Sequence, residues 1–143
     1  MSASDVRPLT ADRIAAYLDE RGYAFATTPT GLVGTWDDQP VWFLLQGPRS
    51  DVLQVRGRLA RAVRVRDRVA VLRALNDWNR GRIWPKVYLR AEADEEVLYA
   101  ELSTDLRAGV TDVQLAAHLT SALVSVTVAL TELGTSLGTA PAS

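Results

Sequence analysis

The feature that most constrains the fold is a long apolar stripe in the C-terminal part of the chain. Its members recur at spacings of four, four, three, four and three residues: Leu115, Leu119, Leu123, Val126, Leu130 and Leu133. These spacings place all of them on one side of a helix. Thr111 and Gln114 form a capping box before the stripe and Gly134 follows it, so we expect a helix from Thr111 to Gly134. Polar residues interrupt the segment, which therefore predicts a buried helix rather than a membrane span.

A helix with one apolar side must bury that side against other elements, and the preceding sequence supplies two more helices. The first is predicted over Ala11–Arg21 with Thr10 as its N-cap. The second is predicted over Arg68–Asn79 with Asp67 as its cap. The residues expected to face the core from these two helices are Ile14, Tyr17, Leu18, Leu72, Leu75 and Trp78.

Apolar and alternating runs between turn residues predict the strands. In order, they are Tyr23–Thr28, Leu32–Trp36, Val41–Gln46, Val52–Val65, Lys86–Ala91 and Val97–Ser103. Most are joined by short turns, which favours antiparallel pairing. We therefore predict an α+β fold, with a mainly antiparallel sheet of five or six strands and three helices on one face. The order is α-β-β-β-α-β-β-α, with a further long strand before the second helix. We also expect Trp36 and Trp42 to pair across the hairpin turn between them.

Length and composition fit one domain. The chain has 143 residues, of which 48% are hydrophobic and 23% are charged. We expect a single domain over residues 10–134, with flexible tails at 1–9 and 135–143. There is no cysteine, which excludes disulfides and cysteine-bound zinc and fits a cytoplasmic protein.

Basic residues are concentrated in the middle of the chain. Residues 49–90 hold 12 basic and 3 acidic residues, whereas the remainder holds 4 basic and 14 acidic residues. One interpretation is a polyanion-binding face on the long fourth strand, formed by Arg56, Arg58, Arg64 and Arg66. The other is that the two regions pair with each other in the fold. We favour the second, and do not expect nucleic acid as a partner, because a net charge of −1 gives weak long-range attraction to it.

The side chains that enzymes use most are scarce in this sequence. His118 is the only histidine and Lys86 the only lysine. Neither a glycine-rich phosphate loop nor a nucleophile elbow is present. Carboxylate pairs such as Glu101 with Asp105 lie where solvated carboxylates are common, and a carboxylate-only enzyme stays the alternative. We therefore expect a protein that is not an enzyme and holds no metal or cofactor.

An unusual segment lies where the second helix meets the following strand. Its candidate binding residues are Asn76, Trp78, Asn79, Arg80, Trp84 and Lys86. In one interpretation the asparagines tie the backbone of the junction and the tryptophans fill the core. In the other, these residues line an aromatic pocket for a small molecule, with polar and cationic rims. The first interpretation is the one we favour.

Two strings in the sequence resemble a known family. The segment Leu75–Arg80 followed by Trp84–Tyr88, and the segment Ser103–Asp112, resemble the YbjN family of proposed bacterial sensory-transduction regulators. The similarity covers about Thr10 to Leu133. It implies a fold like that of type III secretion chaperones, which are often dimeric, and it brings no catalytic residues with it.

The resemblance implies a cytoplasmic, non-catalytic protein that binds or regulates, and we expect a chaperone-like module with an unidentified protein partner. A homodimer through the second helix is also expected, using Val69, Val71 and Ala74. The alternatives are a polyanion binder through the arginine face and a small-molecule binder at Trp78 and Trp84. We expect no association with a membrane.

Overall fold

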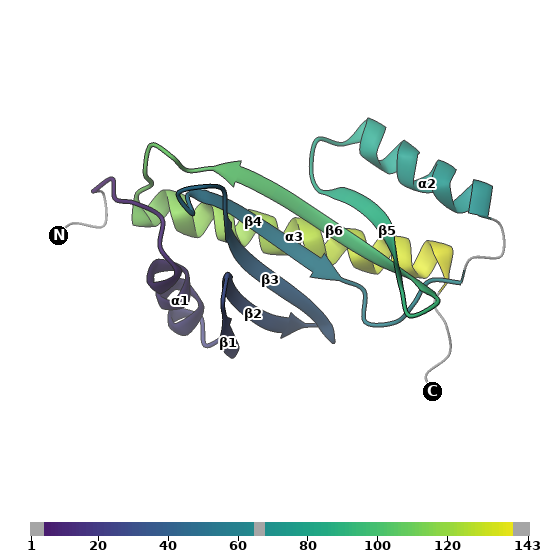
Figure 1. The fold of residues 1–143 in the computed structure, drawn as a ribbon, viewed down its shortest axis with the longest axis horizontal. Helices are drawn as coiled ribbons and strands as arrows, with labels where there is room; N and C mark the ends of the chain where they lie inside the picture. Colours follow the sequence, from purple (N-terminus) through teal and green to yellow (C-terminus); the bar gives the residue numbers. More distant parts are fainter. Residues whose placement is uncertain (1–4, 65–67, 139–143) are drawn as a thin grey trace.

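A computed structural model of the chain describes residues 5–64 and 68–138, which form three helices and one six-stranded sheet (Figure 1). The elements are α1 (Ala11–Glu20), β1 (Phe25–Thr28), β2 (Gly31–Trp36), β3 (Gln39–Gln46), β4 (Val52–Arg58), α2 (Arg68–Gly81), β5 (Lys86–Glu92), β6 (Glu95–Asp105) and α3 (Asp112–Leu137). The predicted fold class and order of elements are confirmed.

The sheet is antiparallel between every pair of neighbours, in the order β1-β2-β3-β4-β6-β5. In the view of Figure 1, α3 runs behind β4 and β6, while α2 lies beside the edge strand β5 and α1 lies near β1 and β2. We call the side of the sheet that α3 does not cover the open face. Strand residues alternate between this face and the core.

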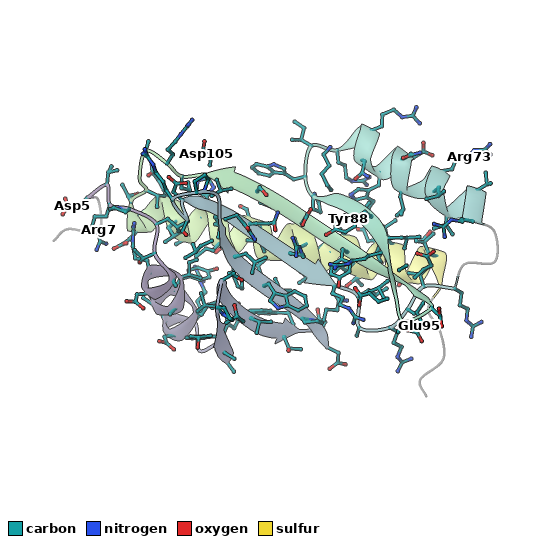
Figure 2. All side chains as sticks on the ribbon, viewed as in Figure 1. Asp5, Arg7, Arg73, Tyr88, Glu95 and Asp105 are labelled. Carbon is teal, nitrogen blue, oxygen red and sulfur yellow. The ribbon has the colours of Figure 1, made fainter. Side chains whose placement is uncertain are left out.

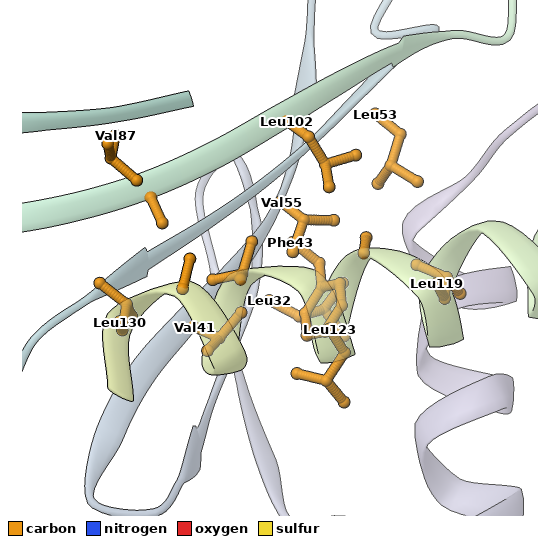
Figure 3. Close-up of a cluster of buried hydrophobic side chains, with 14 of the residues drawn as sticks. Leu32, Val41, Phe43, Leu53, Val55, Val87, Leu102, Leu119, Leu123 and Leu130 are labelled. Carbon is orange, nitrogen blue, oxygen red and sulfur yellow. The ribbon is translucent and has the colours of Figure 1, made fainter. Parts of the chain in front are cut away.

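The predicted stripe of α3 is the centre of the core. All six of its residues are buried, and Figure 3 shows several of them between the helix and the strands: Leu119, Leu123 and Leu130 from α3, with Leu32, Val41, Phe43, Leu53, Val55, Val87 and Leu102 from the sheet. The predicted capping box is present, because the Thr111 hydroxyl accepts from the Gln114 amide at 3.0 Å and the Gln114 side chain accepts from the Thr111 amide at 3.0 Å. The helix lies very close to β4 at Gly57, where an added Cβ would sit 2.3 Å from the Val126 side chain.

The described structure has backbone contacts on both sides of residues 10–134. Gly134 does not end α3; it is buried inside the helix, where its missing side chain leaves room for Leu59. The helix ends at Leu137, and Gly138 follows with a φ of 77°, which favours glycine. At the other end, Arg7 exchanges two backbone hydrogen bonds with Val110.

The long fourth strand was predicted over Val52–Val65, but β4 ends at Arg58. Between β4 and residue 64 the chain makes two backbone hydrogen bonds to β6, from Leu59 to Leu98 and from Val63 to Glu96. The step from Leu59 to Val63 is four residues, whereas the matching step along β6, from Leu98 to Glu96, is two. The period-two alternation is therefore lost in this segment. Arg64 lies after the strand, and Arg66 and Asp67 lie outside the described residues.

Two predictions about aromatic and apolar packing were wrong. Trp36 pairs with Gln39 and not with Trp42, because the turn between β2 and β3 has only two residues. Trp36 packs edge-on against Tyr23 and Phe43, while Trp42 lies on the open face. On α2, Leu72 is exposed and its neighbour Val71 is buried, so the helix is turned by about one residue from the predicted orientation.

Candidate functional site

The junction between α2 and β5 is built around Asn79. Its side-chain Oδ1 accepts a hydrogen bond from the Val87 amide at 2.9 Å, and its Nδ2 donates to the Val87 carbonyl at 2.9 Å. The amide group therefore behaves like a neighbouring strand on the outer edge of β5. Because both groups of Val87 are satisfied by one side chain, the end of α2 is fixed against the sheet.

Trp78 and Lys86 complete this junction. The Trp78 ring is buried, its Nε1 donates to the Pro85 carbonyl at 3.2 Å, and the Arg82 guanidinium lies 3.7 Å from the ring centre. The Lys86 ammonium group lies 3.3 Å from the carbonyl oxygen of Asn79 at the C-terminal end of α2, where a cation is favoured. These contacts agree with the structural interpretation of the segment, in which polar groups tie the backbone and Trp78 fills the core.

The remaining candidate residues face solvent. Asn76 and Arg80 lie on the exposed side of α2, and Arg80 pairs with Asp77 on the same helix. Trp84 is 50% exposed and its neighbour Ile83 is 82% exposed. The structure thus separates the predicted site into an anchoring half, made by Trp78, Asn79 and Lys86, and an exposed half.

Further apolar residues are exposed on α2 itself. Val69 is 61% exposed and Leu72 is 43% exposed, at a spacing of three that puts them on one side of the helix. Figure 2 shows Arg73 on the side of α2 that points away from the sheet. We name seven of the exposed residues of α2 and the junction the α2 surface; they are Val69, Leu72, Arg73, Asn76, Arg80, Ile83 and Trp84.

The open face carries the arginines of β4, and these are paired with acidic residues. Arg56 bonds Glu101 at 3.0 Å and Arg58 bonds Glu92 at 3.1 Å. At the start of α2, Arg68 also pairs with Glu96 of β6. The basic middle of the chain therefore pairs in part with the acidic region that follows it, as we favoured from the sequence. This pairing leaves less free positive charge for a polyanion than the sequence alone suggested.

Two stacked tyrosines shape the ionisation of the open face. The Tyr88 and Tyr99 rings lie 5.5 Å apart. Burial, and after it the nearby Glu101 carboxylate, raise the pKa of Tyr88 to about 12. Burial and a hydrogen bond to Glu92 likewise raise the pKa of Tyr99. The same hydrogen bond, followed by those from Arg58, lowers the pKa of Glu92.

The sequence did not reveal a charged cluster at the other end of the molecule. The Asp112 carboxylate accepts hydrogen bonds from Arg7 at 2.7 Å and from Arg13 at 2.8 Å. Arg13 also donates to the carbonyl oxygens of Arg7 and Val110, both at 2.8 Å. The hydrogen bond from Arg13 is the main reason that the pKa of Asp112 is lowered. Asp112 stood in the family-like string, but its partners lie about a hundred residues away and no local pattern points to them.

Two further findings concern a metal site and a membrane span. Among residues 5–64 and 68–138 there is no group of three or more histidine and acidic side chains placed to hold a metal ion. The helix α3 is long and apolar enough to cross a membrane by length and composition, as the core helices of soluble proteins also are. In the structure it packs on the sheet and supplies the core.

Comparisons with known proteins agree with the fold. A family model named YbjN, described as "Putative bacterial sensory transduction regulator", matches residues 10–134. The chain is similar to the solved structure titled "Crystal structure of YbjN, a putative transcription regulator from E. coli", at 17% identity and a TM-score of 0.79, over 96% of this chain and 100% of that one.

A second solved structure, of an uncharacterized protein from Methanothermobacter thermautotrophicus, is similar at 10% identity and a TM-score of 0.56, over 91% of this chain and 100% of that one. A search of curated proteins finds no match. The family description names a regulator and no enzyme, and the two solved structures support the fold alone.

Proposed function

The chain belongs to the YbjN family, and from this membership we propose that it is a non-catalytic regulatory domain of the cytoplasm that binds a protein partner through the α2 surface. In this proposal the sheet and α3 form a stable scaffold, and α2 is the helix that meets the partner. The sheet and α3 provide rigidity, and α2 is fixed to the sheet edge by Asn79 and Trp78.

The observation that carries this proposal is the exposure of apolar side chains on the α2 surface. Val69, Leu72, Ile83 and Trp84 are all exposed on one short stretch of chain. Exposed apolar groups surrounded by polar ones are typical of protein-binding surfaces, and tryptophan is enriched at their energetic centres. The anchoring contacts of Asn79 hold this surface in place before any partner arrives, which lowers the entropy cost of binding.

The charge of the α2 surface indicates the chemistry of the partner. From Arg68 to Lys86 the chain has five basic residues and only Asp77 as an acidic one. Arg68 is engaged by Glu96, but Arg73 makes no ion pair within the described residues. We therefore expect a partner segment that presents apolar side chains together with acidic ones.

The test is a comparison of two double variants in cells of the source organism. Ile83→Ser with Trp84→Ser removes the apolar part of the α2 surface. The matched control, Val113→Ser with Val124→Ser, removes exposed apolar residues of α3 instead. Each tagged chain is crosslinked in cells, and the captured proteins are quantified by mass spectrometry. We expect at least one protein to be captured by the wild-type and control chains and lost with the Ile83/Trp84 variant. Equal capture by all three chains would contradict the proposal.

A second copy of the chain is an alternative partner for the same surface. Of the residues expected to make a homodimer, Val69 is exposed but Val71 is buried. Light scattering over a concentration series decides between the two partners. A dimer that dissociates on changing Ile83 and Trp84 would identify the partner as this chain itself, whereas a monomer at tens of micromolar would leave the α2 surface to another protein.

A further inference from the structure

We propose a second, separate binding site on the open face of the sheet, for a small aromatic anion in which a planar ring carries a carboxylate or a phosphate. This site shares no residue with the α2 surface, so it goes beyond the function proposed above. It is formed by a cavity of about 350 Å³. That volume falls in the range of small-molecule sites.

The cavity crosses the sheet from the β1–β2 turn to β5. Thr28 and Thr30 form one wall, Trp42 and Leu44 of β3 form the floor, and Arg90 with Tyr99 forms the opposite wall. Trp42 is only half-buried although it lies on a central strand. A partly exposed indole ring that lines a hollow can serve as a stacking partner for a planar ring.

The two cationic residues that line the cavity differ in whether an ion pair already offsets their charge. They are Arg56 and Arg90, and none of the lining residues is acidic. Glu101 is engaged by Arg56, whose charge it offsets, and Glu92 is engaged by Arg58 and Tyr99. Arg90 is therefore the lining cation that has no ion pair within the described residues. It makes no hydrogen bond there either. Its guanidinium carbon lies 6.0 Å from the centre of the Tyr99 ring, and its charge also helps to lower the pKa of Glu92.

Arg56 is oriented so that one of its nitrogen atoms stays available. Its Nε donates to Glu101 at 3.0 Å and its Nη2 donates to the Gln54 side chain at 2.7 Å. Nη1 has no hydrogen-bond partner in the part of the chain that the structure describes. A guanidinium group that is held by two bonds and presents a free donor loses little entropy when it binds an anion.

These observations together select the ligand class. The two guanidinium groups attract an anion, since a charge-assisted hydrogen bond is stronger than a neutral one. The hydroxyl groups of Thr28 and Thr30 and the amide of Gln46 add neutral hydrogen-bonding groups around it. The Trp42 and Leu44 side chains favour an apolar, planar body over a hydrated inorganic ion. An aromatic ring with one anionic group meets all three requirements.

The experiment is a titration of the purified full-length chain followed by NMR of the tryptophan indole and arginine Nε–H signals. The probes are benzoate and phenyl phosphate as the two anionic arms, benzamide as the neutral ring, and inorganic phosphate as the anion without a ring. We expect saturable shifts of the Trp42 and Arg56 signals with at least one anionic arm, and much weaker binding of benzamide and of inorganic phosphate. The arm that binds more tightly distinguishes a carboxylate from a phosphate ligand.

Two variants that change net charge equally test the role of the cavity. Arg90→Gln removes a cation that lines it, and Arg61→Gln removes an exposed cation elsewhere. Arg90→Gln should weaken binding about tenfold, the size of one charged hydrogen bond, while Arg61→Gln should change it less than about twofold. Neither side chain makes a hydrogen bond or ion pair in the described part of the chain, so both variants should fold. Equal weakening by the two changes, or no saturable shift of Trp42 up to about 10 mM probe, would overturn the proposal.

Discussion

The double hydrogen bond between Asn79 and Val87 offers the sharpest test of how the fold presents the α2 surface. Replacing Asn79 with alanine removes both hydrogen bonds, each of 2.9 Å, and leaves no atom in place of the side-chain amide. The Val87 amide and carbonyl then remain at the outer edge of β5 beneath α2. We expect the variant to be clearly destabilised and its α2 to pack less firmly on the sheet.

The magnitude follows from the cost of leaving polar groups without partners. An unsatisfied buried donor or acceptor costs about 1–3 kcal/mol. Two such groups set an upper limit of about 6 kcal/mol. Asn79 is only half-buried, so water can reach part of the vacated space. We therefore expect the free energy of unfolding to fall by about 2–4 kcal/mol.

Urea unfolding followed by circular dichroism measures this loss, and two further variants make it interpretable. Asn76→Ala changes the same residue type on the exposed side of the same helix and should stay within about 0.5 kcal/mol of wild type. Asn79→Asp keeps an acceptor for the Val87 amide but turns a carboxylate oxygen toward the Val87 carbonyl, so it should destabilise at least as much as alanine. If Asn79→Ala and Asn76→Ala unfolded at the same urea concentration, Asn79 would not anchor the junction.

Three further outcomes follow from individual contacts. Gly57→Ala places a methyl group 2.3 Å from the Val126 side chain and should cost about 1–3 kcal/mol in a urea titration, whereas Gly81→Ala, with nothing within 4 Å, should be close to neutral. The pKa of Asp112 is lowered in the folded state, so this carboxylate stabilises the fold above its ordinary pKa of 3.8 and loses that effect as the pH falls below this value. The difference in unfolding free energy between wild type and Asp112→Asn should therefore shrink on acidification. The pKa of Tyr88 is raised to about 12, so the contribution of this neutral hydroxyl to stability is present below its ordinary pKa of 10.0 and is lost as the pH rises from there to about 12. In an ultraviolet titration of tyrosine ionisation, the step near pH 12 should be absent from the Tyr88→Phe variant.

Local sequence patterns were sufficient to predict those elements that are determined by contacts between nearby residues. The spacing of apolar residues and the capping box located the start of α3 and its buried side, and the N-cap at Thr10 located α1. Period two placed Arg56 and Arg58 together on the open face. Each of these inferences depends on contacts within a few residues along the chain, which is the range that periodicity and capping reflect.

The errors arose where two local patterns were equally good. On α2, Val71 and Leu72 both continue the spacing toward Leu75 and Trp78, so the sequence allows two rotations of the helix. The structure has the rotation in which Asn79 reaches the edge of β5, and that choice buries Val71. The rotation of α2 is decided by its contact with β5, and the spacing of residues within the helix cannot reveal that contact.

The same reasoning explains the end of α3. Glycine after an apolar stripe usually ends a helix, and Gly134 has that position. In the fold, however, Leu59 lies against this point of the helix, and an added Cβ would come within 3.1 Å of its side chain. The glycine therefore serves close packing between α3 and the segment after β4. Only knowledge of which element crosses the helix there distinguishes the two roles.

The two proposed sites are held by different contacts, so they should fail separately. The α2 surface depends on the anchoring of α2 to Val87 by Asn79. The position of Arg90 depends instead on its pairing with Val97 of β6, on the other side of β5. A folded Asn79→Ala protein should therefore lose partner binding through the α2 surface while its cavity still binds the aromatic anion. Loss of both together would show that α2 and the open face are coupled through β5, and the chain would then have to be understood as one cooperative unit and not as a scaffold with two independent surfaces.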